Sequence, residues 1–316
     1  MSLYRYTVRR FLQIIPVLLG VFTLTFVMMH ALPGNPVDIY LGPNPDPEVR
    51  QALIEEYGFN EPLWQQYIDY LIHVLQGNIG ESFLAQEPVS SVMMTRLGPT
   101  VTLMGLSYLI ALPIAIGLGI YAASRYNQAG DHVSRFLGLA GVSTPNFWLG
   151  LMLIFAFAYT YEVFPASGYV TFAADPVRAA KHLILPVITL ATAQTATLMR
   201  MTRSSMVEEL GEGYVETMRA YGIPERKVLI KHAFRNAMLP LVTIIGLQIS
   251  FLLDGAVVIE EIFAIPGMGR MFFKAITNQD YGVVMGGTIV FALVFLIGVI
   301  ITDLAYAYID PRIRYD

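Results

Sequence analysis

Long, nearly uninterrupted apolar runs constrain this chain more than any other feature of its sequence. A helix needs about 20 residues to cross a hydrocarbon layer of about 30 Å. Six runs have roughly that length, and their approximate bounds are 9–29, 100–122, 136–161, 182–201, 237–260 and 283–306. Only 14% of the residues are charged, whereas 55% are hydrophobic. The sequence therefore predicts an all-α integral membrane protein with about six transmembrane helices.

Three prolines, Pro113, Pro145 and Pro186, lie in or near these runs. Membrane helices tolerate proline because neighbouring helices and local rearrangements satisfy the backbone groups that it leaves free. We therefore expect the runs to remain helices. The first run, from Phe11 to Leu32, is too long for a signal peptide and is interpreted as a retained helix.

Lysine and arginine accumulate on one side of the alternating connections. Of the 20 basic residues, 14 lie at the N-terminus, in the second and fourth connections, or in the tail. Cytoplasmic segments retain Lys and Arg preferentially, so we expect both termini to be cytoplasmic in a multi-pass protein of the cell membrane. Residues 1–31 would hold the cytoplasmic start and first helix, 100–308 the other five helices, and 309–316 a cytoplasmic tail.

The first connection, residues 32–99, is long and acidic and is predicted to be an external subdomain inserted after the first helix. A helix is expected from Pro47 to Tyr57, where helix formers follow a proline. A second helix is expected from Pro62 to Leu75. Its apolar face is predicted to consist of Trp64, Tyr67, Tyr70 and Leu71.

The connection formed by residues 202–236 contains a pattern typical of a helical hairpin. Residues 214–221 can form a short helix, and Gly222 can adopt the left-handed conformation that ends one. Pro224 and Glu225 suit the first turn of a second helix that runs toward Asn236. On this second helix Lys227, Lys231 and Arg235 recur every four residues, which predicts one basic face.

This hairpin resembles the cytoplasmic loop of binding-protein-dependent ABC importer permeases. In that family the loop docks into a groove on the ATPase subunit. This chain departs from the family pattern at Met218, where an alanine is usual. The resemblance implies a docking role for Tyr214, Val215, Glu216, Arg219, Ala220, Gly222, Pro224, Leu239 and Pro240. Two other interpretations of the hairpin are a DNA-binding helix-turn-helix and a plain basic loop. The hairpin is tethered to the bilayer at both ends, which argues against DNA binding.

Further matches extend over nearly the whole chain and narrow the family to the dipeptide, oligopeptide and nickel permeases. The matching segments are Arg9 to Val37, Leu63 to Phe83, Ser143 to Gly150, Glu260 to Gly269 and Asp310 to Tyr315. They are similar to the first permease of a heterodimer, which implies the type I ABC importer fold. The implied partners are a homologous second permease, two ATPase subunits that carry ATP and Mg, and an extracytoplasmic peptide-binding protein.

The chain lacks the motifs of a self-sufficient enzyme. It has no GxxxxGK[ST] phosphate loop, no HExxH motif and no cysteine, and its five histidines are scattered. We therefore expect a non-catalytic translocation subunit without cofactor, metal or nucleic acid, whose energy comes from partner subunits.

Polar residues inside apolar runs are costly, so each is a candidate for the transport path. The candidates are Ser143, Asn146, Thr192, Gln194, Gln248, Ser250 and Asp254. For each Ser or Thr taken singly, hydrogen bonding or packing between helices is the more common explanation. Four residues are predicted at the external mouth, where cap packing is an equal alternative: Glu260, Glu261, Pro266 and Gly267.

These patterns favour a permease for dipeptides or oligopeptides that works by alternating access. A nickel or glutathione permease shares the same scaffold, but a cation path would carry mid-membrane carboxylates or histidines, and none is evident. A self-contained secondary transporter would carry inverted repeats or an ionisable relay. A non-transporting scaffold would leave the hairpin unexplained.

Overall fold

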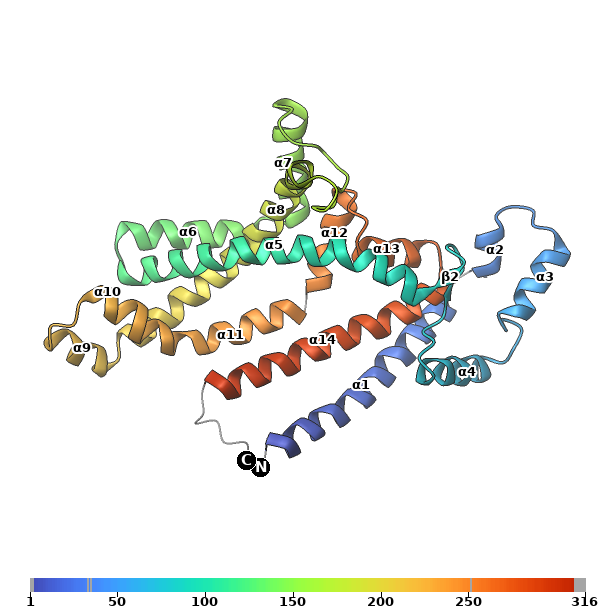
Figure 1. Cartoon of the computed structure of the whole chain (residues 1–316), viewed down its shortest axis with the longest axis horizontal. Coiled ribbons are helices and arrows are strands. Elements are labelled where there is room, and N and C mark those ends of the chain that lie inside the picture. The colour runs from blue at the N-terminus through green and yellow to red at the C-terminus, as the bar shows by residue number, and fades with distance from the viewer. Residues whose placement is uncertain (1–2, 33, 35, 251, 310–316) are drawn as a thin grey trace. The chain divides into compact units, whose positions relative to one another are not determined.

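The computed structural model describes residues 3–32, 34, 36–250 and 252–309. These residues are mostly helical (Figure 1), and a two-stranded antiparallel sheet joins β1 (Glu81–Ser82) to β2 (Glu87–Pro88). The helices are α1 (Leu3–Ala31), α2 (Pro36–Leu41), α3 (Pro47–Glu56), α4 (Leu63–Leu75), α5 (Val89–Ser124), α6 (Ala129–Ser143), α7 (Asn146–Leu153), α8 (Pro176–Leu210), α9 (Gly213–Ala220), α10 (Glu225–Lys227), α11 (Phe234–Ser250), α12 (Leu252–Ile262), α13 (Met268–Thr277) and α14 (Tyr281–Ile309). Two π-helical stretches, η1 (Ile154–Thr160) and η2 (Val228–Ala233), follow α7 and α10 directly.

Within the described residues, five helical stretches are long and apolar enough to cross a membrane. A sixth is present if α6 and α7 with η1 are counted as one broken span. The predicted all-α fold with about six membrane helices is therefore confirmed. The chain divides into two compact units, Met1–Gly98 with Gly267–Leu296, and Pro99–Pro266 with Ile297–Asp316.

In the first unit, the predicted external helices are present as α3 and α4. Tyr67, Tyr70 and Leu71 of α4 pack against Phe22 of α1 and Met285 of α14, so the apolar side of α4 is covered within this unit. Trp64, which was predicted on the same apolar face, is 66% exposed and takes no part in this packing. Trp64 lies in the first turn of α4, before the residues that pack on α1 and α14.

The start of α14 is fixed by a buried carboxylate. Asp280 precedes α14 and accepts a hydrogen bond from the Val283 backbone N–H at 3.3 Å, as a helix cap does. The Ser82 hydroxyl donates to the same carboxylate at 2.6 Å, and the Phe83 N–H donates to it at 3.2 Å. These contacts bind the short sheet to α14.

In the second unit, an apolar core forms where α5, α8 and α12 meet. Leu103 of α5, Leu183 and Leu190 of α8, and Ile259 with Phe263 from α12 and its C-terminal end are all buried in it. The predicted run 182–201 is the middle of α8, which is 35 residues long.

The run 136–161 was expected to be one helix, but the structure breaks it. Helix α6 ends at Ser143, and α7 begins at Asn146 at an angle of 96°. Thr144 has extended backbone angles (φ −84°, ψ 119°) because the ring of Pro145 disfavours a helical residue before it. Pro145 therefore starts a new helix instead of continuing the old one.

The predicted connection 202–236 is also shorter than expected. Residues 202–210 continue α8, and the chain from Glu225 onward is helical through α10, η2 and α11. Lys227, Lys231 and Arg235 are all exposed, and the π-helical stretch that contains Lys231 lies between the other two residues. What remains between the long helices is α9 with a turn on each side.

Candidate functional site

Helix α9 is an exposed eight-residue helix with a complete C-terminal stop. The Ile223 N–H donates to the Met218 carbonyl at 3.1 Å, and the Gly222 N–H donates to the Arg219 carbonyl at 2.9 Å. Gly222 has φ +73°, which glycine adopts without the steric cost of a side chain. This pair of bonds is the Schellman arrangement, so Gly222 has the local role that its position in the sequence predicts.

An ion pair spans the turn that follows. The Arg219 guanidinium donates to both carboxylate oxygens of Glu225, at 3.1 and 2.7 Å. Both side chains are about half exposed, so water screens the pair and its contribution to stability is small. The pair links the last turn of α9 to the first residue of α10 across Pro224.

A second set of contacts ties α9 to two long helices. The Tyr214 hydroxyl donates to Glu209 near the end of α8 at 2.6 Å, and the Asn236 side-chain amide of α11 donates to the same carboxylate at 2.7 Å. Partial burial, followed by the Glu209 carboxylate, raises the pKa of Tyr214 to about 12. Sequence reasoning missed Glu209 and Asn236, because nothing in a linear pattern signals a contact across 22 or 27 residues.

The predicted docking residues divide into a supporting group and an exposed group. Val215 is fully buried, and Leu239 and Pro240 are half-buried inside α11. The exposed residues are Glu216, Arg219, Ala220, Gly222 and Pro224. Tyr221 was not singled out from the sequence, yet it is 83% exposed beside Gly222. Its position directly after a short polar helix could have identified Tyr221 as a candidate docking residue from the sequence.

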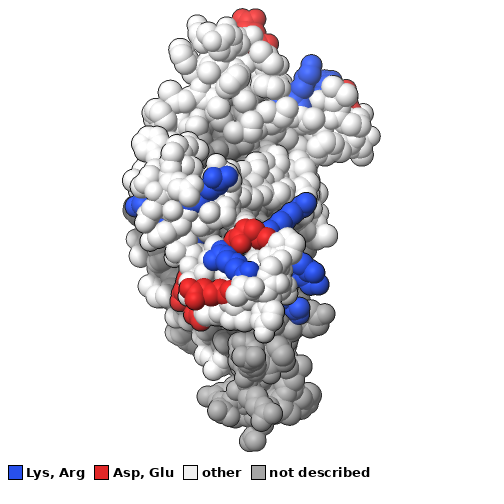
Figure 2. Space-filling view, turned by 90° about the vertical axis from the view of Figure 1, so that its left-hand side faces the viewer, with Lys and Arg blue, Asp and Glu red and all other residues white. Residues whose placement is uncertain are grey.

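Figure 2 views the end of Figure 1 at which α9 and α10 lie. On this face Lys and Arg side chains are interspersed with smaller groups of Asp and Glu. The surface is therefore mixed in charge with a basic excess, which suits a partner surface that carries both signs.

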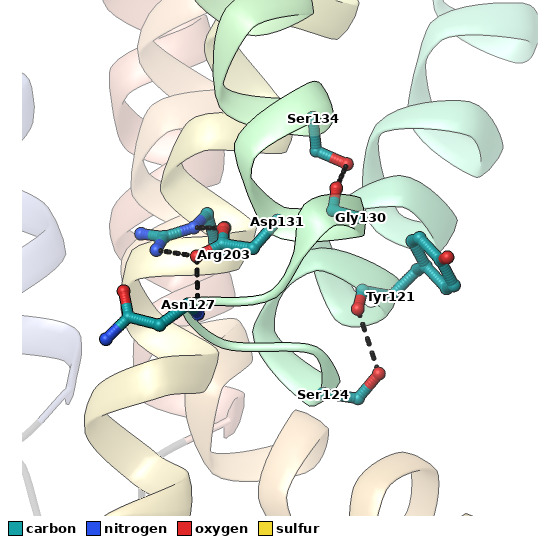
Figure 3. Close-up of polar contacts among 7 residues, drawn as sticks. All are labelled: Tyr121, Ser124, Asn127, Gly130, Asp131, Ser134 and Arg203. Carbon is teal, nitrogen blue, oxygen red and sulfur yellow. Dashed lines mark hydrogen bonds and ion pairs between the residues drawn. The ribbon is translucent and has the colours of Figure 1, made fainter.

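Close to this end, a buried ion pair joins α6 to α8 (Figure 3). The Arg203 guanidinium donates to both oxygens of Asp131, with one contact at 2.8 Å, and the Asn127 backbone N–H donates to Asp131 at 3.0 Å. Asp131 is fully buried, and the guanidinium also lies 5.6 Å from the ring centre of Tyr126. The sequence analysis did not identify this pair.

The candidate path residues fall in different places of the second unit. Ser143 and Asn146 flank the break between α6 and α7. Thr192 lines a mainly apolar cavity of about 350 Å³ formed by α5, α6 and α8, while its hydroxyl donates to the Ile188 carbonyl. The side-chain oxygen of Gln194 is buried and has no hydrogen-bond partner among the residues that the structure describes.

Two helices meet at Gln248, which accepts a hydrogen bond from the Tyr108 hydroxyl at 3.4 Å. The side chains of Ser250 and Asp254 lie outside the described residues. No single described cavity is defined by these path candidates together.

The predicted mouth residues are more enclosed than expected. Glu260 is fully buried, and the Thr100 hydroxyl donates to its carboxylate at 2.6 Å. Glu261 and Pro266 are half-buried, and Gly267 is the N-cap residue of α13. In this conformation Glu260 serves the packing of α5 on α12 and does not offer its carboxylate to a partner.

Known proteins match the chain over its whole length. Residues 115–315 match the family described as binding-protein-dependent transport system inner membrane component, and residues 3–104 match the N-terminal part described for the same class of membrane component. The oligopeptide transport system permease protein AppB of Bacillus subtilis is 41% identical over 98% of this chain and 99% of its own.

Two further relatives are named dipeptide transport system permease protein DppB, from Alkalihalophilus pseudofirmus and Escherichia coli. Each is 38% identical over 98% of this chain and 99% of its own length. The helices that can cross a membrane agree with a multi-pass membrane protein. The chain belongs to the family of binding-protein-dependent transport system inner membrane components.

Proposed function

We propose that this chain is the permease subunit of an ABC importer for dipeptides or oligopeptides. The support is the full-length similarity to relatives named for oligopeptide and dipeptide transport, at 38 to 41% identity. The chain translocates the solute and performs no chemistry of its own.

The energy comes from partner proteins in this proposal. Two ATPase subunits bind ATP and Mg, a homologous second permease completes the path, and an extracytoplasmic binding protein delivers the peptide. The family description, a binding-protein-dependent membrane component, supports the delivering protein. The excess of Lys and Arg on one side supports cytoplasmic termini and a cytoplasmic position for α9.

The main structural support for the mechanism is the attachment of α9 to the long helices α8 and α11. Its exposed residues, with Tyr221, form the surface that docks on an ATPase. Tyr214 and Asn236 both contact Glu209, so a displacement of α9 acts on α8 and α11 together. Rigid connections of this kind allow ATPase closure to change the helix arrangement.

Alternating access then follows from movement of these helices. ATP binding draws the ATPases together, α9 moves with them, and the path between the helices opens outward to accept peptide. Hydrolysis then resets the helices. The proposed path comprises Ser143, Asn146, Thr192, Gln194, Gln248, Ser250 and Asp254. The proposed external mouth comprises Glu261, Pro266 and Gly267 together with Glu260, which is buried against Thr100 in the present conformation.

The test is recovery of ATPase subunits with the complete purified transporter, followed by ATP-dependent uptake of a labelled dipeptide in vesicles. Ala220→Glu places a bulky charge on the exposed face of α9 and destabilises the helix by about 1 kcal/mol or less. We expect it to abolish ATPase recovery and uptake. Gln128→Glu, which adds the same charge at an exposed position outside the hairpin, is the matched control and should retain both.

Uptake of dipeptide by the chain without ATPases or ATP would refute the importer assignment and favour a secondary transporter. If Ala220→Glu recovers ATPases at the native level, docking at α9 is refuted. That result would not bear on the assignment of the transported solute.

A further inference from the structure

A hollow between α6 and α8 combines basic and apolar walls. It has a volume of about 710 Å³ and is lined by Arg135, Phe136 and Leu139 from α6 and by Arg200 and Arg203 from α8. None of these residues belongs to the proposed docking surface or transport path.

The two helices form this hollow because they approach each other closely. A Cβ atom at Gly138 would lie 2.7 Å from the Met199 methyl and 3.0 Å from the Arg200 Cγ, and one at Gly141 would lie 2.7 Å from the Ala196 Cβ. The stem of Arg200 therefore lies against the backbone of α6 at Gly138. This contact places Arg200 at the same groove as Arg135, which is one turn earlier on α6.

The hollow carries an excess of positive charge. Asp131 neutralises Arg203 through two hydrogen bonds. Arg135 and Arg200 are exposed, and within the part of the chain that the structure describes no ion pair includes either of them. Two guanidinium groups therefore remain for an anion, and the bidentate geometry of Arg suits phosphate oxygens.

The apolar wall indicates which kind of anion fits. Phe136 is 71% exposed and Leu139 is 59% exposed, both on α6 next to the basic residues. A small water-soluble anion gains nothing from such a wall, whereas a molecule with a phosphate head and a hydrocarbon chain contacts both parts. Basic pockets between membrane helices at the cytoplasmic side bind anionic lipid head groups for this reason.

We propose that this hollow binds one anionic phospholipid of the cytoplasmic leaflet. The phosphodiester lies between Arg135 and Arg200, and an acyl chain lies along Phe136 and Leu139. The location in that leaflet rests on the proposed orientation of the chain, whereas the preference for an anionic lipid does not. Bound lipid bridges α6 and α8 and adds to the contact already made by Asp131 and Arg203.

The test is native mass spectrometry of the purified full chain, titrated with dioleoyl phosphatidylglycerol, with phosphatidylcholine of the same chains, and with inorganic phosphate. We expect one tight phosphatidylglycerol per chain and weaker binding of the other two probes. Each juxtamembrane arginine adds about fivefold to the affinity for an anionic lipid. R135Q/R200Q should therefore weaken phosphatidylglycerol binding by about 25-fold, and R135Q alone by about fivefold.

The control is R178Q/R226Q, which removes the same charge from two exposed positions outside the hollow and should bind as the native chain does. Phe136→Ser should weaken phosphatidylglycerol binding without changing phosphate binding. The proposal is overturned if R135Q binds phosphatidylglycerol as tightly as the control. It is equally overturned if Phe136→Ser has no effect and phosphate competes with the lipid on equal terms, because the site would then be a plain anion site. R135Q alters a single exposed side chain, so it decides the matter even if the double variant does not fold.

Discussion

The carboxylate of Asp131, fully buried at the start of α6, accepts two hydrogen bonds from the guanidinium of Arg203 on α8. The two residues are 72 positions apart in the sequence, and their pair joins α6 to α8 directly beside the hollow assigned to a lipid. Because Asp131 is fully buried, its charge is compensated by protein groups, chiefly Arg203 and the Asn127 N–H, with a smaller contribution from Arg135.

Asp131→Asn should destabilise the protein, because it leaves the guanidinium of Arg203 partly buried without an acceptor of opposite charge. Breaking fully buried pairs costs 3–5 kcal/mol, and Arg203 retains some exposure, so we expect about 2 kcal/mol. Thermal unfolding in mild detergent measures the change. The double variant D131N/R203Q should be less destabilised than the sum of the single changes, and simple additivity would show that the two residues are not coupled.

Two helical glycines should respond to alanine in opposite directions. A Cβ at Gly282 would lie 1.7 Å from the Glu81 carbonyl oxygen, so Gly282→Ala must displace the short sheet from α14 and should cost several kcal/mol. At Gly117 of α5 nothing lies within 4 Å of a Cβ, so Gly117→Ala should stabilise the helix by up to about 1 kcal/mol. Unfolding temperatures of the two variants provide the measurement. A similar shift for both would refute the close approach at Gly282.

The segment between α1 and α5 should lose an ion pair in acid. Arg50 of α3 donates to both oxygens of Asp38 in α2, at 2.5 and 3.1 Å, and this hydrogen bonding lowers the pKa of Asp38. A carboxyl whose folded pKa is depressed contributes its stability above its unfolded pKa of about 4, and that contribution is lost as the pH falls through the folded value. We expect the effect to be small, because both side chains are well exposed.

Arg50→Gln should return the pKa of Asp38 toward its ordinary value, as followed by carbon NMR of the carboxyl group. Gln51→Ala, which removes a neighbouring side chain that bonds to Glu55 instead, should leave the titration unchanged. An unaltered Asp38 titration in R50Q would contradict the assignment of the shift to Arg50.

The sequence predicted the membrane helices because apolar length is a local property. Their ends were harder to place. Helix α8 begins at Pro176 because the Asp175 carboxylate caps the Val177 and Arg178 N–H groups at 3.0 Å, and it continues through residues 202–210, which are too polar for a span. Hydropathy marks the lipid-facing part of a helix, whereas hydrogen bonding decides where the helix stops.

The effect of each proline on its helix was equally hard to predict from the sequence. Pro113 and Pro186 remain inside α5 and α8, whereas Pro145 separates α6 from α7. The sequence carries the same signal at all three positions, and only packing distinguishes a tolerated proline from a break. The hairpin stop at Gly222 could be predicted because it is local. The partners of Glu260 and Glu209 could not, because Thr100 and Asn236 are distant in sequence.

Ala264 offers a test of backbone strain next to the predicted mouth. Helix α12 ends with a bond from the Ile265 N–H to the Glu260 carbonyl at 2.8 Å, in the arrangement seen at Gly222, but the left-handed position is occupied by alanine with φ +52°. A side chain at such a position costs roughly 1–2 kcal/mol, while glycine costs about 0.5–1 kcal/mol more in chain entropy. Ala264→Gly should therefore be stabilising by up to about 1 kcal/mol, whereas Ala264→Val should be destabilising because a branched side chain fits this conformation poorly. Thermal unfolding of both variants separates the outcomes, and a loss of stability with glycine would show that the methyl group of Ala264 contributes more by packing than the backbone loses by strain.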